Sequence, residues 1–468
     1  MPERGGSPNF LHGALSKAFK TVNFSSSQTN HDLGNIERGI LLHGLPEDDL
    51  QLVKNSCIQW YRTWLQCEIR DMQADFYLQV RYDSSISSNG SQEQSFPLVC
   101  AELAFVAKLL RDQEFMTLEH PLEQLQRSSH WVASQSQHLN NRLRSLQQQV
   151  VFAYIGFLTM LYQPVMCPAK DQLQIVERKI GHNHSRNTVK QRSFQLHEYD
   201  GIPLSDLLWH FGGRHGLIPR GRSWLSMEGD SRRPGTLTAA NVSYYTLTKL
   251  TGVEIMWVGC ICEHLEFDPR SKVLKLFQFP SFCAMLCLNL DDSIYMERLL
   301  EDYFANDEQN EPSRQHTLPV PTADLLREVI YSYRLLFGQD RSSYRAFRKD
   351  RSKYAAQYDF ENGSDPLLPR LCGSDWSKEI IYAELEAPNV KTVYPVYVDF
   401  AFFGDRLLDF QDFVSIQCPN SWMTLYRDRR DINRFWTLWV VVFLGIATTF
   451  LAIVQIALQV IQISQSAG

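Results

Sequence analysis

The sequence predicts a mainly α-helical protein with a central α+β region that contains a β-hairpin, followed by a single C-terminal transmembrane helix. Three observations predict this class. Apolar residues recur at three- and four-residue steps in several segments, as on the buried face of a helix. In the middle of the 468-residue chain the pattern changes to the alternation that is typical of strands. The chain then ends in a long apolar segment that begins at Phe435.

Composition excludes several classes of protein. The net charge is −6 and 21% of the residues are charged, so the chain lacks the basic excess of a nucleic-acid binder. Its ten cysteines are scattered through the sequence, unlike the dense disulfide framework of a small secreted domain. We expect most of them to be buried, reduced thiols. Residues 1–20 contain no continuous apolar core, so a cleaved secretory signal is not expected.

The C-terminal segment has the composition of a transmembrane helix. No residue from Phe435 to Gly468 is charged. A helix of about 20 residues from Phe435 to Val454 would be about 30 Å long, which matches the hydrocarbon core of a bilayer. Trp436 and Trp439 stand where the aromatic belt of a membrane interface would lie. The sequence therefore predicts a membrane-spanning helix over residues 435–461.

Basic residues on one side of this segment predict its orientation. Arg427, Arg429, Arg430 and Arg434 precede it, and no basic residue follows it. Basic flanks remain on the cytoplasmic side, so we expect most of the chain to lie in the cytosol and the segment to insert after synthesis, as in tail-anchored proteins. The organelle is not predicted. The Asn-x-Ser sequons would then stay unmodified; they begin at Asn23, Asn89, Asn183, Asn241 and Asn362.

The rest of the chain divides into four predicted regions. Residues 1–44 are rich in Gly, Ser and Asn and predict a disordered arm. Residues 45–178 predict a helical region with a heptad-like helix, and residues 179–310 an α+β region. Residues 311–434 predict a second helical region that ends in the basic flank.

A heptad-like pattern covers residues 118–150. Apolar residues alternate there by four and three, with two serines within the series. Two interpretations follow: a helix packed within the same chain, or a coiled coil with a protein partner. The short apolar run that begins at its end, residues 150–162, is too short to cross a bilayer and predicts a buried helix. The heptad positions are Leu118, Leu122, Leu125, Ser129, Val132, Ser136, Leu139, Leu143, Leu146 and Val150.

Two further segments have clear local signals. Residues 253–279 predict two strands joined around Asp268, Pro269, Arg270 and Ser271. Residues 322–337 predict an amphipathic helix that ends at Gly338.

Four phrases of the sequence resemble a known family: "LHEYDGIPL", "HLEFDPRSKVLKLFQFPSFC", "YSYRLLFGQDRSS" and "RDRRDINRFWTLWVVVF". They are similar to a fungal family of uncharacterised proteins with a C-terminal membrane segment, over residues 190–460. The resemblance implies a fungal, membrane-attached protein and links it to variable gene sets, among them secondary-metabolite clusters. It implies no active site, cofactor or metal.

Searches for catalytic and metal motifs assign no site. Cys260, Cys262 and His264 alternate along a predicted strand, and with Cys283 and Cys287 they predict either a thiolate-rich zinc site or buried thiols. The stretch "GLIPRGRS" departs from a phosphate loop, and "HNHSR" lacks further ligands at a metal-binding spacing. We assign no catalytic, cofactor-binding or metal-ligating residue.

Residues 340–354 combine basic and aromatic side chains. In a helix, Arg341, Arg345, Arg348 and Lys349 would share one face. This face is either a solvated surface or a contact with anionic lipid headgroups, which an adjacent anchor would favour.

Three functions are compatible with these features. The first is a membrane-anchored scaffold or accessory factor, with the lipid bilayer as one partner, no nucleic acid, and a protein partner at residues 118–150 in the coiled-coil interpretation. The second is a membrane-tethered enzyme with a site near Asp200, Cys260, Cys262 and His264. A third, a magnesium channel subunit, fits poorly, since such channels have two spans and a Gly-Met-Asn signature.

Overall fold

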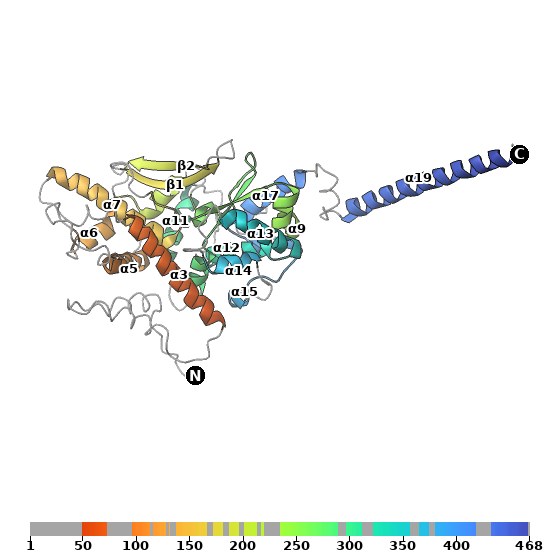
Figure 1. Cartoon of the computed structure of the whole chain (residues 1–468). Helices are drawn as coiled ribbons and strands as arrows, with labels where there is room; N and C mark the ends of the chain where they lie inside the picture. Colours follow the sequence, from red (N-terminus) through yellow and green to blue (C-terminus); the bar gives the residue numbers. More distant parts are fainter. Residues whose placement is uncertain are drawn as a thin grey trace.

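The computed structural model is mostly helical, with three small sheets and one long C-terminal helix (Figure 1). It describes residues 49–72, 96–112, 116–127, 131, 137–165, 172–180, 187–195, 201–212, 217–219, 235–288, 296–310, 322–355, 365–373, 380–417 and 432–466. The predicted arm, residues 1–44, lies outside these ranges. So do Asp200, the "HNHSR" stretch, and most of "GLIPRGRS".

The N-terminal half of the body is built from helices and one hairpin. Its elements are α3 (Asp49–Met72), α5 (Phe96–Asp112), α6 (Glu119–Arg127), α7 (Gln137–Thr159), β1 (Gln172–Ile180), β2 (Asn187–Gln195) and α8 (Leu204–Gly212). The buried helix predicted after the heptad pattern is the second half of α7, where every side chain from Val150 to Thr159 is buried. Strands β1 and β2 pair antiparallel along their whole length.

The prediction of one continuous helix over the heptad pattern was wrong. The pattern is divided between α6 and α7, and Trp131 between them lies in a bend. The Trp131 indole N–H donates to buried Glu102, which also accepts from the Tyr154 hydroxyl, and this buried hydrogen-bond pair holds the bend against the core. Leu122, Leu125 and Val150 belong to the core of the same chain. These three heptad positions therefore pack within the chain.

The central region contains a three-stranded sheet in the order β4-β6-β5. Strands β4 (Glu254–Val258) and β6 (Val273–Phe277) are parallel, and β5 (Phe267–Asp268) pairs antiparallel with β6. The predicted turn is confirmed: the Asp268 carboxylate accepts from the Arg270 N–H at 3.0 Å and from the Ser271 hydroxyl at 2.6 Å. The predicted long first strand was wrong, because the chain leaves β4 after Val258 to form the 3-10 turn η7 (Ile261–Glu263).

The remaining elements complete the body. They are β3 (Thr236–Thr238), α9 (Ala239–Val242), the π-helical turn η6 (Thr246–Leu250), α10 (Pro280–Cys287), α11 (Glu297–Asn310), α12 (Thr322–Phe337), α13 (Arg341–Ala355), α14 (Leu367–Gly373), α15 (Ile380–Glu384), β7 (Val393–Pro395), α16 (Val396–Asp399) and α17 (Gly404–Ile416). The predicted helix over residues 322–337 is α12, and the Gly338 N–H bonds to the Arg334 carbonyl at its end. One buried apolar cluster extends from Cys57 to Val414 and joins all these parts.

Two buried carboxyl groups in this core accept hydrogen bonds from backbone N–H groups at or just before the first turns of helices. Asp365 accepts from the backbone N–H groups of Ser281, Leu367 and Leu368, at 2.7, 2.8 and 2.9 Å, and from the Ser281 hydroxyl at 2.6 Å. It thereby joins the first turns of α10 and α14. Glu328 of α12 accepts from the N–H groups of Phe402 and Phe403 just before α17.

These carboxyl groups make stability depend on pH. Burial raises the pKa of Asp365 from 3.8 to about 7 and that of Glu328 from 4.5 to about 8, although the hydrogen bonds they accept lower both values. Between each ordinary pKa and its raised value the folded chain holds a proton that the unfolded chain has lost, so the free energy of unfolding falls as the pH rises.

We expect unfolding of the full chain in detergent micelles, measured with urea, to show this fall between pH 5 and pH 8. Each group contributes up to about 1.4 kcal/mol per pH unit. Glu328→Gln, which cannot ionise, should flatten the decline, most clearly above pH 7. Stability that rises over this range would contradict the assignment.

Candidate membrane interface

Helix α19 (Ile432–Ser466) is long and apolar enough to cross a membrane. Its apolar stretch runs for 25 residues from Trp439 to Ile463, with a mean hydropathy of 2.4, and none of it is buried against the body. At 1.5 Å per residue the stretch is about 37 Å long, enough to cross a hydrocarbon core of about 30 Å with some tilt. Among the described residues it is the one helix with these properties.

The two threonine hydroxyls within this stretch are satisfied by the helix itself. The Thr448 hydroxyl lies 2.9 Å from the Leu444 carbonyl, and the Thr449 hydroxyl lies 2.8 Å from the Gly445 carbonyl. Such internal bonds suit a helix in lipid, where no water is available to pair with a hydroxyl. Gly445 has open space around its Cα within the described part of the chain.

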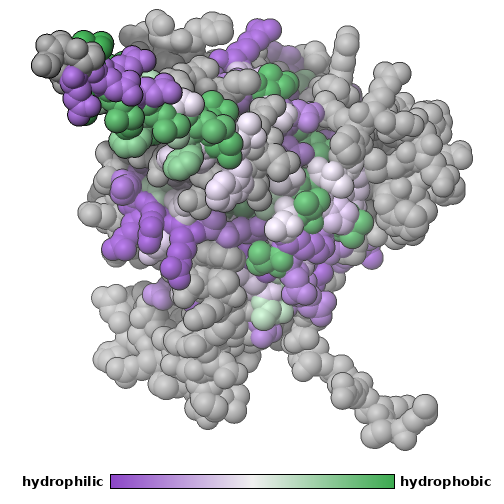
Figure 2. Space-filling model, turned by 90° about the vertical axis from the view of Figure 1, so that its right-hand side faces the viewer, coloured by the Kyte–Doolittle hydropathy of each residue, from purple (hydrophilic) through white to green (hydrophobic). Residues whose placement is uncertain are grey.

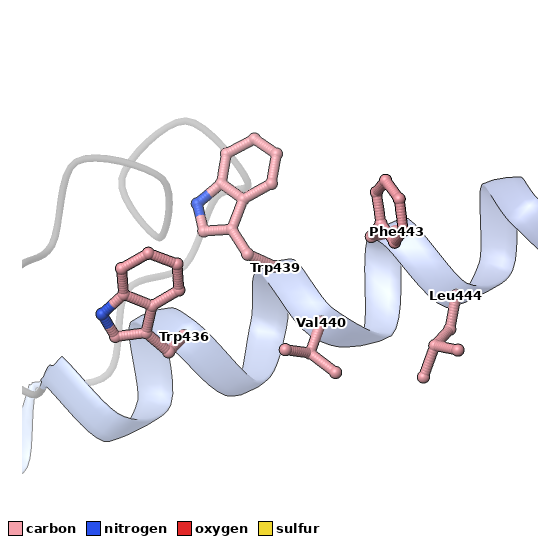
Figure 3. Close-up of a pocket in the computed structure, with 5 residues that line it drawn as sticks. All are labelled: Trp436, Trp439, Val440, Phe443 and Leu444. Atoms are coloured by element: carbon pink, nitrogen blue, oxygen red, sulfur yellow. The ribbon is translucent and has the colours of Figure 1, made fainter.

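The start of the apolar stretch carries two exposed tryptophans. Trp436 is 62% exposed and Trp439 38% exposed. With Val440, Phe443 and Leu444 they line an apolar hollow along the helix (Figure 3). Both indole nitrogens point toward the N-terminal end of α19, away from the apolar run (Figure 3). This orientation suits an interface, where the ring lies against lipid and its N–H faces the headgroups.

The predicted arginine flank is described only in part. Arg434 lies in the first turn of α19, and its side chain is outside the described set. Arg427, Arg429 and Arg430 lie in residues 418–431, which are also outside it. The orientation that these residues predict therefore remains a prediction.

Helix α13 presents the predicted basic face to solvent. Arg341, Arg345, Arg348 and Lys349 are all exposed. None of the four makes an ion pair with another residue in the described part of the chain. At 100° per residue they cover an arc of about 100° on the helix.

The opposite face of α13 is fixed to the body. Phe347 packs edge-on against Tyr244 and Phe337, with ring centroids 5.6 and 5.1 Å away. Asp350 accepts from the Tyr244 hydroxyl at 2.9 Å and pairs with Lys249 at 2.8 Å. Because these contacts fix the rotation of the helix, the basic face keeps a defined direction.

Exposed aliphatic side chains form a feature that the sequence reasoning missed. Outside α19, the large hydrophobic residues that are exposed in the described part of the chain are Val390, Val393, Val398 and Ile416. All four lie in the last segment before α19. A signal for them exists in "VYPVYV", where Tyr394 is buried and both its neighbours are exposed, but this alternation is too short to separate surface from core.

The cysteine–histidine cluster is buried and structural. Cys260, Cys262 and His264 occupy the 3-10 turn, not a strand, so they do not line one face as predicted. His264 Nδ1 accepts from the Phe277 N–H at 3.1 Å. His264 Nε2 lies 2.8 Å from the Ser332 hydroxyl, which itself donates to a backbone carbonyl, so Nε2 carries the proton. Both ring nitrogens are therefore engaged.

The electrostatics of the cluster keep its ionisable side chains uncharged near neutral pH. Burial, together with the nearby Arg406, lowers the pKa of His264 well below its ordinary value. Burial raises the pKa of the Cys260 and Cys262 thiols, so both stay protonated near neutral pH. Arg406 donates to the carbonyl of Cys262 at 2.8 Å and also to that of His264, and so fastens α17 to the turn.

Cys283 and Cys287 lie on α10 and are also buried. The Cys287 thiol lies 3.7 Å from the Ala323 carbonyl. Within the described residues, no three His, Cys, Asp or Glu side chains come together in a group that could hold a metal ion. The eight described cysteines are free thiols, and six of them are buried.

Comparison of the chain with protein-family models, curated proteins and solved structures gives no match. The class of protein is therefore defined by the structure alone: in the part of the chain that it describes, a mostly helical body is joined to one helix that can cross a membrane.

Proposed function

We propose that the chain is a single-pass membrane protein in which α19 is the anchor and the folded body acts in the cytosol as a scaffold or accessory factor. The observation that carries the proposal is the 25-residue apolar stretch of α19, none of which is buried in the described part of the structure. Exposing an apolar surface of this extent to water is unfavourable, and insertion into lipid removes it from water. The four flanking arginines support the cytosolic side for the body.

The burial of Cys260, Cys262 and His264 gives no support to the enzyme alternative at the site that the sequence suggested. Cys260, Cys262 and His264 are buried, and their polar groups serve hydrogen bonds within the fold. A substrate could reach them only if the core opened. The hydrogen bonds of this cluster therefore join α17, β6 and α12.

Glycan mapping tests the orientation. Full-length chain carrying an added Asn-x-Thr tag after Gly468 would be synthesised with microsomes. We expect the tag to gain one glycan and the native sequon at Asn241, on the partly exposed helix α9, to gain none. Glycan on the native sequons together with an unmodified tag would show that the chain has the opposite orientation. A chain with glycan at neither end would contradict insertion when an added lumenal control protein is modified normally.

The arginine flank supplies a matched variant for the same assay. Replacing Arg427, Arg429, Arg430 and Arg434 by glutamine removes the charge that retains this side in the cytosol. We expect a mixture of both orientations, while glutamine at Arg62 and Lys108, on α3 and α5, should change nothing.

A further inference from the structure

The basic face of α13 and the exposed aliphatic residues lie in the same part of the body. The Gln339 side chain, at the turn between α12 and α13, donates to the Tyr394 hydroxyl in β7. Arg341 follows two residues after Gln339, and Val393 adjoins Tyr394. Strand β7 pairs with β3, whose Thr238 N–H bonds to the Gln411 side chain of α17 at 2.6 Å. Ile416 ends α17 and is 76% exposed.

This part of the body is also the part joined to the anchor. Fifteen Cα–Cα steps separate Gln417, just after α17, from Ile432, at the start of α19. A fully extended chain of that length spans about 50 Å, so the end of α17 stays within this distance of the membrane interface. Figure 1 shows α9, α13 and α17 at the end of the body nearest α19. Figure 2 views that end and shows hydrophilic side chains spread over it, with separate hydrophobic patches between them.

We propose that this end of the body docks on the bilayer that α19 spans, and that Arg341, Arg345, Arg348 and Lys349 bind the headgroups of anionic lipids there. The proposal rests on the proposed function, because the anchor keeps the surface close to lipid. The exposed aliphatic residues enter the interfacial layer beside the headgroups. Basic side chains together with exposed apolar ones are typical of surfaces that lie on membranes.

The charges and the tether together explain why lipid is the favoured partner. A basic residue near an anionic leaflet is attracted to it, so four such residues together favour the docked state. Tethering raises the effective concentration of the surface at the membrane. The preference weakens with salt, since the contacts are electrostatic.

Photo-crosslinking tests the docking in the full chain. A photoreactive residue would replace Ser342, which is exposed next to the basic face, and the chain would be reconstituted into nanodiscs of phosphatidylcholine alone or with 30% phosphatidylserine. Carbonate-resistant, protease-protected α19 would first show that the anchor has inserted. We expect lipid crosslinks to be several-fold more abundant with phosphatidylserine and to fall when salt is raised to 0.5 M.

Charge reversal provides the decisive comparison. Arg345→Glu with Lys349→Glu should lower the crosslink yield about tenfold, since two attractive contacts become repulsive. Arg62→Glu with Lys108→Glu makes the same change of charge on exposed residues of α3 and α5 and should leave the yield unchanged. Equal falls in both variants would mean a general charge effect and would overturn the proposal.

Other outcomes are equally informative. Equal crosslinking in both lipids would show apolar contact without anionic recognition, and crosslinks to a second copy of the chain would show a protein interface; either result overturns the proposal. A chain that inserts but gives no lipid crosslink refutes docking alone. A chain that fails to insert refutes the proposed function instead.

Discussion

Two arginines at the centre of α19 are expected to remove the chain from the membrane. Phe450 and Leu451 lie at the middle of the apolar stretch and are 65% and 61% exposed. On insertion scales an arginine at the helix centre costs about 2.5–3.5 kcal/mol, whereas Phe or Leu contributes about 0.3–0.6 kcal/mol in favour of insertion. Phe450→Arg with Leu451→Arg therefore costs about 6–8 kcal/mol, which offsets the gain from the other apolar residues.

The measurement is the fraction of chain that sediments with microsomes after alkaline carbonate washing. We expect most of the double variant in the supernatant. Two arginines at Gln59 and Thr63, exposed positions of α3, add the same charge to the body and should leave the chain in the pellet. A double variant that sediments like the unchanged chain would show that some other part of the protein holds the membrane.

Removal of the Asp365 carboxyl group should cause the largest loss of stability in the body. Asp365→Ala leaves the buried N–H groups of Ser281, Leu367 and Leu368 without their acceptor. Losing several bonds to one buried carboxyl group costs about 3–5 kcal/mol, a large part of the 5–15 kcal/mol that stabilises a typical domain. We expect a much lower urea midpoint of unfolding for the full chain in micelles.

Asp365→Asn and Asp268→Ala serve as comparisons. Asn keeps one acceptor oxygen of similar size and should lose less than Ala. Asp268 also accepts a backbone N–H and a serine hydroxyl, but it lies in an exposed turn, so its alanine variant should lose about 1 kcal/mol or less. Similar losses for Asp365→Ala and Asp268→Ala would show that the buried carboxyl group is not a major fastening of α10 and α14.

Long periodic segments were predictable because their pattern is decided within one helix. Helix α12 and the spanning segment of α19 both follow their predicted residues closely. The heptad pattern failed because the contact that holds the bend, from Trp131 to Glu102, joins residues 29 apart in sequence. A local period contains no information about such a partner.

The candidate site shows the same division. The exposed basic face of α13 follows from the helix period. The exposure of Val390, Val393 and Ile416 instead depends on how the neighbouring elements pack, which the local sequence does not show. The Cys260–His264 segment alternates like a strand, yet His264 bonds to Ser332 of α12, and Arg406 of α17 holds the backbone of the turn. These tertiary contacts override the strand preference of the segment.

Protease protection in sealed microsomes tests most directly whether α19 crosses the bilayer. The full-length chain would carry an epitope after Gly468 and be treated with protease outside the vesicles. We predict that the body is digested while a short fragment, containing α19 and the epitope, survives until detergent is added. Digestion of both the body and the epitope in intact vesicles, with a lumenal marker still protected, would contradict the spanning helix.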